Sequence, residues 1–287
     1  MSESALSADY VIIGAGIAGA SAAYWLAPYG RVIVLERETQ PGYHSTGRSA
    51  AQFMESYGSL QVRRLTRASR AFFMQPPAGF APHALIHPRS SLFVATTGQE
   101  DLLREQWELL RQTSPNLQRL DAAHACALFP VLQPDKVCGA LLDPDTCDMD
   151  VDALLQGFLR GVRQAGGQIV TQAEVKQMRR EKDGLWHVQA ADRTFIAPVV
   201  VNAAGAWADE IARLAGAEPL GLEPRRRSAF TFSVSEGMDT AAWPMAIGIA
   251  ENWYIKPDAG QLLGSPANPH PVPSPEVQPE EIDSATG

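Results

Sequence analysis

The stretch "DYVIIGAGIAGASAAYWLA" near the N-terminus constrains the fold more than any other feature of the sequence. Its apolar, β-branched start is typical of a buried parallel strand, and "ASAAYWLA" predicts a helix of small residues that can pack close to a sheet. Pro28 and Gly30 end that helix, and "RVIVLE" supplies a second strand. The order of strand, glycine loop, helix and strand predicts a βαβ unit.

Three glycines, Gly14, Gly16 and Gly19, separate the first strand from the helix. In a dinucleotide cradle the first allows a tight turn, the second lets the backbone approach a diphosphate, and the third lets the helix pack closely. The helix N-terminus then offers N–H groups and the positive end of its dipole to the phosphates. Glu36 ends the second strand 22 residues after Gly14, where a carboxylate can bond a ribose hydroxyl. This combination predicts a dinucleotide site, and the alternative is a glycine-rich turn beside a surface glutamate.

Composition narrows the class of partner. The 287 residues carry a net charge of -8, which argues against a nucleic-acid partner because phosphate binding needs a basic surface. The uncharged residues 10–30 contain glycines and follow an acidic stretch, so we expect neither a transmembrane segment nor a secretory signal. Cys126, Cys138 and Cys147 show no CxxC spacing, which favours a reducing, cytoplasmic compartment over a disulfide framework. We expect no metal site, since "HALIH" lacks the glutamate of a metalloprotease helix.

The rest of the chain alternates between two kinds of pattern. "DVDALLQGFLRGVRQAG" has the apolar spacing of a helix with Asp150 as its N-cap, and "APVVVNAAGAWADEIARLAG" predicts a buried strand leading into a helix. "QIVTQAEVKQMRR", "LWHVQA" and "RTFIA" predict short strands between them. "SLFVAT", "RSAFTFSV" and "ENWYIKP" look like strands of another sheet, and "QEDLLREQWELLRQT" and "DAAHACALFP" predict helices. The proline-rich stretch 266–279 predicts a loop.

The βαβ unit alone does not separate NAD from FAD, because both cofactors carry the same adenosine diphosphate. The segment after the second strand does: "VLERETQPGYHSTGRSAA", together with "VIIGAGIAGASAAYWLA" and "VVVNAAGAWADEIA", resembles the D-amino acid oxidase-like family of FAD-dependent oxidoreductases. The resemblance extends through "RRSAFTF" and "YIKPDAG", covers nearly the whole chain, and is strongest toward the bacterial D-arginine dehydrogenase type. It implies FAD as the cofactor and argues against a nicotinamide dehydrogenase.

The predicted fold class is therefore α/β, with a Rossmann-like FAD-binding domain interrupted by a mixed α+β substrate domain that contains an antiparallel sheet. We assign residues 1–84 and 146–219 to the FAD-binding domain. Residues 85–145 and 220–287 are assigned to the substrate domain.

The resemblance also implies which residues hold the FAD. The loop Ser45–Ala51 would lie along the diphosphate and the flavin ring, with Arg48 complementing the phosphate charge. Val175 would meet the adenine through its backbone, and Gly205 would form a turn near the cofactor, unless they are an ordinary strand residue and a packing glycine. We interpret His44 as a solvated loop histidine rather than as a catalytic base. The predicted cofactor-binding residues are Gly14, Ala15, Gly16, Ile17, Ala18, Gly19, Glu36, Arg37, Ser45, Thr46, Gly47, Arg48, Ser49, Ala50, Ala51, Val175 and Gly205.

Oxidation of an amino acid by a flavin needs the substrate held with its carboxylate clamped and its amine neutral, which is mostly a matter of positioning. The resemblance implies Tyr57, Arg226 and Tyr254 as catalytic and substrate-binding residues, because phenols and a guanidinium can bond the carboxylate or the amine. Alternatively, the two tyrosines have solvated hydroxyls at a domain boundary, and Arg226 belongs to a solvated run of arginines. Gln52 and Ser91 complete the predicted substrate-binding set. They stand where the most similar family members have a histidine and an acid, so neutral or apolar D-amino acids are the expected substrates. The alternative is that Ser91 is a surface strand residue and that another acid, Glu55 or Glu251, supplies the charge.

The implied function is the oxidative deamination of D-amino acids in amino acid catabolism. A hydride leaves the α-carbon for the flavin, the imino acid hydrolyses to a 2-oxo acid, and a quinone, a carrier or oxygen takes the electrons onward. One alternative is a related flavin amine oxidase that acts on glycine or an N-methyl amino acid. Another is an inactive fragment that binds FAD weakly, because family members continue beyond the position of Gly287 with more sheet and a second carboxylate-binding arginine.

Overall fold

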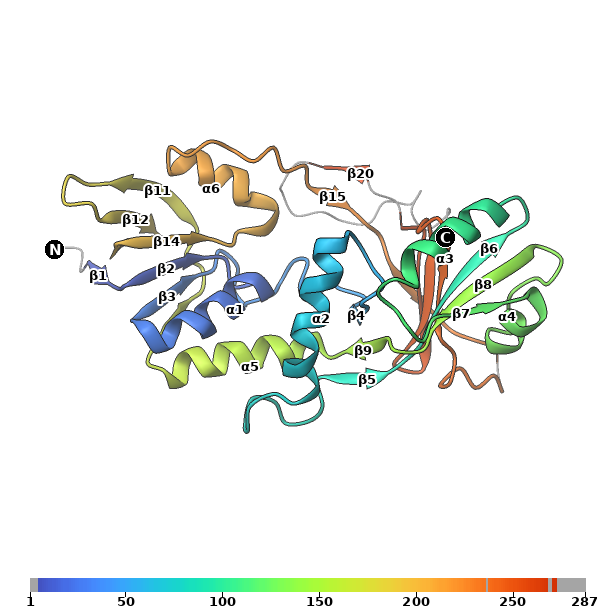
Figure 1. The fold of residues 1–287 in the computed structure, drawn as a ribbon. Coiled ribbons are helices and arrows are strands. Elements are labelled where there is room, and N and C mark those ends of the chain that lie inside the picture. Colours follow the sequence, from blue (N-terminus) through green and yellow to red (C-terminus); the bar gives the residue numbers. More distant parts are fainter. Residues whose placement is uncertain (1–4, 236, 268–269, 273–287) are drawn as a thin grey trace. The chain divides into compact units, whose positions relative to one another are not determined.

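The computed structural model describes residues 5–235, 237–267 and 270–272 (Figure 1). They belong to two compact units, each assembled from segments that are distant in the sequence. The first unit is made from Met1–Ser49, Pro76–Leu85 and Asp150–Pro224, and the second from Ala50–Gln75, Ile86–Met149 and Arg225–Gly287.

The first unit is built on a parallel sheet of four strands in the order β10-β3-β2-β14. These strands are β10 (Gln168–Val170), β3 (Val32–Leu35), β2 (Tyr10–Ile13) and β14 (Val199–Asn202), and every neighbouring pair is parallel. The predicted βαβ unit is confirmed, since α1 (Ile17–Leu26) and the short η1 (Ala27–Tyr29) connect β2 to β3. The predicted return of "APVVVN" to the nucleotide-binding sheet is confirmed by the pairing of β14 with β2.

Alternate residues of the central strands face two different cores. Ile12, Val32 and Val34 pack with Ala23 of α1 and Val162 of α5 (Val151–Gln164). Their neighbours in sequence, including Ile13 and Leu35, pack against a second sheet. Burial on both faces is what the continuous apolar strands predict for a parallel sheet.

The second sheet of this unit has the order β1-β13-β12-β11. Its strands are β1 (Leu6–Ser7), β13 (Arg193–Ala197), β12 (Trp186–Ala190) and β11 (Val175–Arg180). Strands β11, β12 and β13 are antiparallel, and Val188 and Phe195 contribute to the shared core. After β14 the chain forms η2 (Gly205–Trp207) and α6 (Ala208–Leu214).

The second unit contains a sheet of seven strands in the order β16-β19-β18-β17-β6-β8-β7. The strands are β16 (Phe230–Phe232), β19 (Gln261–Ser265), β18 (Tyr254–Asp258), β17 (Met245–Gly248), β6 (Ser91–Thr96), β8 (Val137–Asp143) and β7 (Gln118–Leu120). The expected antiparallel sheet is present, with one parallel pair between β17 and β6. The helices α3 (Glu100–Leu110) and α4 (Ala122–Leu128) cover opposite faces, because Phe93 packs with Leu103 of α3 and Leu92 packs with Ala125 of α4.

Three smaller elements complete the second unit. A short sheet has the order β4-β9-β5, from β4 (Gln52–Phe53), β9 (Cys147–Met149) and β5 (Ile86–Pro88). Strands β15 (Arg225–Arg226) and β20 (His270–Pro271) form an antiparallel pair, and α2 (Leu60–Met74) follows β4. None of the helices in the described residues is long and apolar enough to cross a bilayer.

The sequence assigns residues 50–75 to the FAD-binding domain, but they lie in the second unit. Gln52 and Phe53 pair with Asp148 and Cys147 of β9, and Arg70 of α2 forms an ion pair with Glu55. These partners are all in the second unit, so residues 50–75 belong to that unit as well. Of the predicted loop 266–279, residues 268–269 and 273–279 lie outside the described residues.

Candidate functional site

The glycine loop between β2 and α1 has the geometry of a nucleotide cradle. Gly14 has φ +101°, a conformation that side chains rarely adopt, and a Cβ there would lie 2.4 Å from the carbonyl oxygen of Ala203. A Cβ on Gly19 would lie 1.8 Å from the carbonyl oxygen of Gly14. A Cβ on Gly16 would instead meet only the Thr46 hydroxyl, at 3.2 Å. Glycine is thus needed at positions 14 and 19 because a side chain would clash with the backbone, whereas at Gly16 no backbone atom blocks a side chain.

The N-terminus of α1 lies at the end of this loop, and its N-cap residue supplies no side chain to bond the first N–H groups. Gly16 is the N-cap, and the first turn holds no acidic residue that would compete with an anion. The backbone N–H of Ile17 donates to the hydroxyl of Thr46 at 3.0 Å. This bond joins the predicted diphosphate loop to the helix terminus.

Glu36, at the end of β3, is mostly buried and its carboxylate faces the cradle. One oxygen accepts from the Ala15 N–H at 2.8 Å and the other accepts from the Glu38 N–H at 3.0 Å. A carboxylate offers about four lone-pair sites, so these two bonds fix its orientation and leave capacity for further donors. The hydroxyls of a ribose are donors of this kind.

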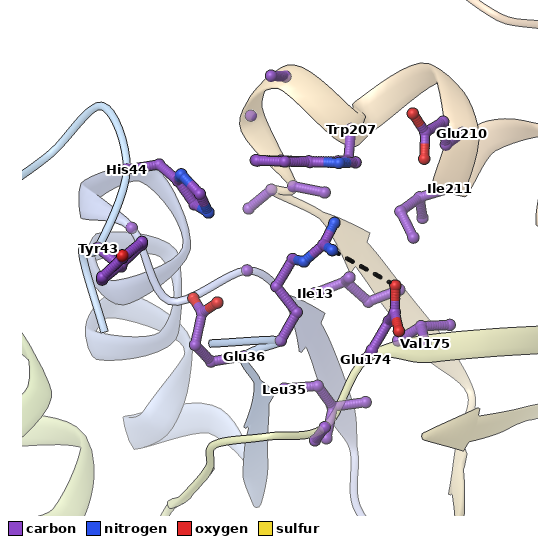
Figure 2. A pocket seen from close by; sticks show the side chains of 18 of the residues that line it. Ile13, Leu35, Glu36, Tyr43, His44, Glu174, Val175, Trp207, Glu210 and Ile211 are labelled. Atoms are coloured by element: carbon purple, nitrogen blue, oxygen red, sulfur yellow. Dashed lines mark ion pairs between the residues drawn. The ribbon is translucent and has the colours of Figure 1, made fainter. Parts of the chain in front are cut away.

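A pocket in the first unit brings these groups together (Figure 2). Figure 2 shows Ile13, Leu35 and Val175 on one side and Trp207 with His44 on the other. Of the predicted cofactor-binding residues, those that line the pocket are Gly14, Gly16, Glu36, Arg37, Ser45, Thr46, Val175 and Gly205. The remaining ones are not part of its wall: Ala15, Ile17, Ala18 and Gly19 lie in the loop and helix beneath it, and Gly47, Arg48, Ser49, Ala50 and Ala51 follow along the chain.

An aromatic and charged cluster occupies one side of the pocket, and of its members only Arg37 was predicted from sequence to bind the cofactor. The guanidinium of Arg37 lies 4.7 Å from the centre of the Trp207 ring and forms ion pairs with Glu38 and Glu174. His44 is also 4.7 Å from Trp207, centre to centre, and its Nε2 is 2.9 Å from the Glu38 carboxylate. His44 is therefore a part of the pocket wall held by an acid, rather than a solvated loop residue.

The loop predicted to run along the diphosphate and the flavin is divided between the units. Residues 45–49 belong to the first unit and residues 50–51 to the second. Arg48 stacks on Tyr43, with its guanidinium 5.0 Å from the ring centre. Gly205 has φ +55°, a conformation that favours glycine, and a Cβ there would have no neighbour within 4 Å.

All five predicted substrate-binding residues lie in the second unit. Tyr57 is 41% exposed. Burial raises the pKa of the Tyr254 phenol, against the opposing effects of a Ser265 hydrogen bond and the Arg227 charge, so the phenol keeps its proton. Arg226 lies in β15, with its Nη2 3.4 Å from Nδ1 of His270.

Gln52 and Ser91 are neighbours. Nε2 of Gln52 donates to the hydroxyl oxygen of Ser91 at 3.2 Å, and Ser91 has no exposed surface (0%). Next to them, Asp148 bonds two cations: its Oδ1 accepts from Lys256 at 2.7 Å and its Oδ2 pairs with Arg89. Within the described residues there is no group of three histidine, cysteine or acidic residues that could hold a metal ion.

The fold and the pocket define a class of protein. A parallel sheet, a glycine cradle open at Gly16 and an acid at the end of β3 are the features of a dinucleotide-binding protein of the Rossmann type. Residues 9–286 match the profile of the family described as FAD dependent oxidoreductase (DAO). The chain belongs to this family, and its cofactor is FAD.

Individual relatives are distant. Human mitochondrial dimethylglycine dehydrogenase is 24% identical over 267 residues, which cover 90% of this chain and 30% of that protein. The chain thus spans about a third of the length of this relative. L-proline dehydrogenase from P. horikoshii superposes with a TM-score of 0.84 at 20% identity, covering 99% of this chain and 75% of that one. Glycine oxidase from Geobacillus kaustophilus gives 0.79 at 21% identity, covering 98% and 76%. At such identities the structural likeness shows the fold, and the predicted mixed α/β class is confirmed.

Proposed function

We propose that this protein oxidises amino acids, with FAD as the electron acceptor, and that it takes D-amino acids with neutral or apolar side chains. The observation that carries the proposal is the pocket in the first unit, where Glu36, Gly16 and the open N-terminus of α1 meet. The resemblance of the loop sequences to D-arginine dehydrogenases supports the D-amino acid class.

The residues at hand fit the adenosine half of FAD. The carboxylate of Glu36 would accept ribose hydroxyls, and the apolar wall of Ile13, Leu35 and Val175 would contact the adenine. The N-terminus of α1 would face the diphosphate, next to the space that Gly16 leaves open. Bound FAD supplies a two-electron acceptor that takes a hydride from the α-carbon of a substrate.

The residues proposed for the substrate are Tyr57, Tyr254 and Arg226. A guanidinium can hold a carboxylate through two parallel hydrogen bonds, which fixes the substrate in one orientation. Tyr254 keeps its proton because burial raises its pKa, so its hydroxyl can donate to a carboxylate throughout the neutral pH range. Positioning of this kind supplies rate without a dedicated base.

A neutral substrate side chain is favoured by the charges of the second unit. Ser91 is buried and carries no charge; of the two alternative acids, Glu55 pairs with Arg70 and Glu251 is exposed to solvent. Asp148 pairs with both Lys256 and Arg89. A guanidinium or ammonium side chain buried beside Ser91, Glu55 and Asp148 would therefore lose its water without gaining a free carboxylate as partner. Burying a charge in this way costs free energy.

The test begins with purified protein saturated with FAD under anaerobic conditions. D-methionine, D-phenylalanine, D-arginine and their L-isomers are added in turn, and loss of the visible flavin absorbance reports substrate oxidation. We expect bleaching by the neutral D-isomers and 2-oxo acid as the product. Faster reduction by D-arginine, or by the L-isomers, would contradict the proposed specificity.

A second candidate is the oxidation of glycine or an N-methyl amino acid. It is favoured by the similarity to human dimethylglycine dehydrogenase and to a glycine oxidase structure. Glycine, sarcosine and N,N-dimethylglycine belong in the same panel. Bleaching by these compounds alone would replace the D-amino acid assignment.

A further inference from the structure

His44 is a titratable side chain in the wall of the nucleotide pocket, and its acid partner fixes one of its two ring nitrogens. Nε2 of the ring lies 2.9 Å from Oε1 of Glu38. An ionised carboxylate can only accept, so Nε2 carries a hydrogen in both the neutral and the charged form of the ring. Nδ1 has no hydrogen-bond partner among the described residues. A second proton can therefore bind at Nδ1 without breaking a contact of the chain, and it turns this part of the wall into a cation.

Aromatic neighbours hold the ring of His44 in place (Figure 2). Its centre lies 4.7 Å from that of Trp207 and 5.0 Å from that of Tyr43. The His44 side chain is 23% exposed, so a charge on it is only partly screened by water and salt. A change of charge at this ring is therefore felt by other charges in the pocket.

Glu38 connects His44 to the groups that are expected to bind the adenosine half of FAD. Oε1 of Glu38 is also 3.2 Å from Nε of Arg37, and its backbone N–H donates to the carboxylate of Glu36 at 3.0 Å. The loop that carries His44 also carries Thr46, whose hydroxyl accepts a hydrogen bond from the N-terminus of α1 at 3.0 Å. His44 thus links the acid at the end of β3 to the loop beside the helix terminus.

The lining of the pocket carries more negative than positive charge. Its acids are Glu36, Glu174 and Glu210. Among the described residues of the lining, Arg37 is the cation, so one positive against three negative charges leaves -2. A proton on His44 reduces this charge to -1. Because the diphosphate of FAD is itself an anion, the proton weakens the repulsion between the cofactor and the wall.

We propose that protonation of His44 tightens the binding of FAD, so that the loading of the protein with its cofactor depends on pH. His44 acts as a positioning residue that holds Glu38 and the loop, and its charge offsets the acids of the lining. This inference concerns the cofactor and does not depend on which substrate is oxidised.

The pH range of the effect follows from the side chains around the ring. The charged or titratable groups that surround His44 are Arg37, Glu38, Tyr43, Arg48, Glu174 and Glu210. Histidine is the side-chain type whose charge changes between about pH 5 and 8, and among the described residues of the lining His44 is the histidine. FAD affinity should therefore fall as the pH rises through this range.

The test is a titration of FAD into FAD-free protein at about pH 6 and at about pH 8.5, at constant ionic strength, followed by flavin fluorescence. Attraction between partly exposed charges changes an equilibrium about 3- to 5-fold, so wild type should bind FAD more tightly at the lower pH by this factor. His44→Gln should bind equally at both pH values, because its amide can donate to Glu38 but takes up no proton. His83→Gln is the matched control, since His83 also pairs with an acid in the first unit but lies outside the pocket lining. It should keep the wild-type ratio.

Proton uptake gives a second measurement that a loss of packing in the variant would not imitate. If the protonated form binds FAD more tightly, then FAD binding must draw a fraction of a proton from the buffer near neutral pH. Calorimetric titrations in two buffers with different ionisation enthalpies measure this fraction. Wild type and His83→Gln should take up part of a proton, and His44→Gln should take up none.

The outcomes distinguish this inference from the proposed function. Equal affinity of wild type at both pH values, or tighter binding at the higher pH, would overturn the role of His44. So would a His44→Gln protein that keeps the pH dependence, or that binds FAD more weakly by the same factor at both pH values. A protein that shows the expected pH dependence but whose flavin is reduced by none of the amino acids supports this inference and contradicts the proposed function.

Discussion

Replacing Gly16 tests the nucleotide cradle without rebuilding the fold. Gly16 has φ -71°, which alanine and valine adopt freely, and a new Cβ would meet only the hydroxyl of Thr46. Because Gly16 is the N-cap of α1, the variant should lose up to about 1 kcal/mol of stability, the usual cost of alanine at this position. For a chain of this size that corresponds to a fall in Tm of about 2–4 °C.

The effect on FAD should be larger than the effect on the fold. The added Cβ lies 3.2 Å from the Thr46 hydroxyl, in the part of the pocket wall where the diphosphate is expected. Overfilling a packed contact costs about 1–3 kcal/mol, so Gly16→Ala should raise the Kd for FAD about 5- to 150-fold. Gly16→Val, with two further methyl groups, should abolish measurable binding.

Gly19→Ala is the matched control on the same helix. Its Cβ would lie 1.8 Å from the backbone oxygen of Gly14, so the loop itself must shift. We expect a lower Tm than for Gly16→Ala even without FAD. Scanning fluorimetry of FAD-free protein and titration of FAD by flavin fluorescence give the two quantities. A Gly16→Val protein that binds FAD as tightly as wild type would refute the cradle assignment.

Two further predictions concern stability. Asp148→Asn should destabilise the protein by about 3–5 kcal/mol in urea unfolding, because it leaves the charges of Lys256 and Arg89 without their carboxylate, whereas Glu108→Gln in an exposed ion pair should cost at most about 1 kcal/mol. Asp150 caps α5, and the bond from the Ala153 N–H, followed by that from His83, lowers its pKa. Its contribution is thus present above the unfolded pKa of about 3.9 and is lost as the pH falls through the folded value, so Asp150→Ala should cost about 1 kcal/mol at pH 7 and less at pH 3.

The features that were predictable from sequence depend on residues close together in the chain. The turn at Gly14, the close approach at Gly19 and the carboxylate of Glu36 all lie within one βαβ unit, where spacing fixes geometry. "SLFVAT" is the observed strand β6, since its limits depend on local turn residues.

The features that were missed depend on distant partners. Trp207 and Glu174 join the pocket from elements far from the glycine loop, and the only hint of Trp207 was its place beside the predicted turn at Gly205. Residues 50–75 joined the second unit because the partner of Gln52 is Asp148, 96 residues away. The strand pattern of "SLFVAT" did not predict that Ser91 is fully buried, because the groups that bond its hydroxyl, Thr146 and Gln52, are distant in the sequence.

The last prediction concerns the segment by which the chain leaves the first unit, which ends at Pro224. The buried carboxylate of Asp209 accepts the backbone N–H groups of Leu220, Gly221 and Leu222, at 3.0, 2.9 and 2.9 Å. A hydrogen bond to a charged group contributes about 1.5–3 kcal/mol, so losing even one bond in Asp209→Ala should raise the open population of this segment about 10- to 150-fold.

Thermolysin cleaves before leucine, and the side chains of Leu220 and Leu222 are exposed. Protection of this segment from cleavage therefore depends on the hydrogen bonds of its backbone to Asp209. We expect cleavage there to accelerate in Asp209→Ala and also in Asp209→Asn. The carboxylate of Asp209 accepts hydrogen bonds through both of its oxygens, whereas the asparagine side chain has only one acceptor oxygen. Glu210→Ala, an exposed acid on the same helix, should cleave at the wild-type rate. Hydrogen exchange at residues 220–222 measures the same opening directly. Equal protection in wild type and Asp209→Ala would mean that some other contact, and not this carboxylate, fixes the end of the first unit.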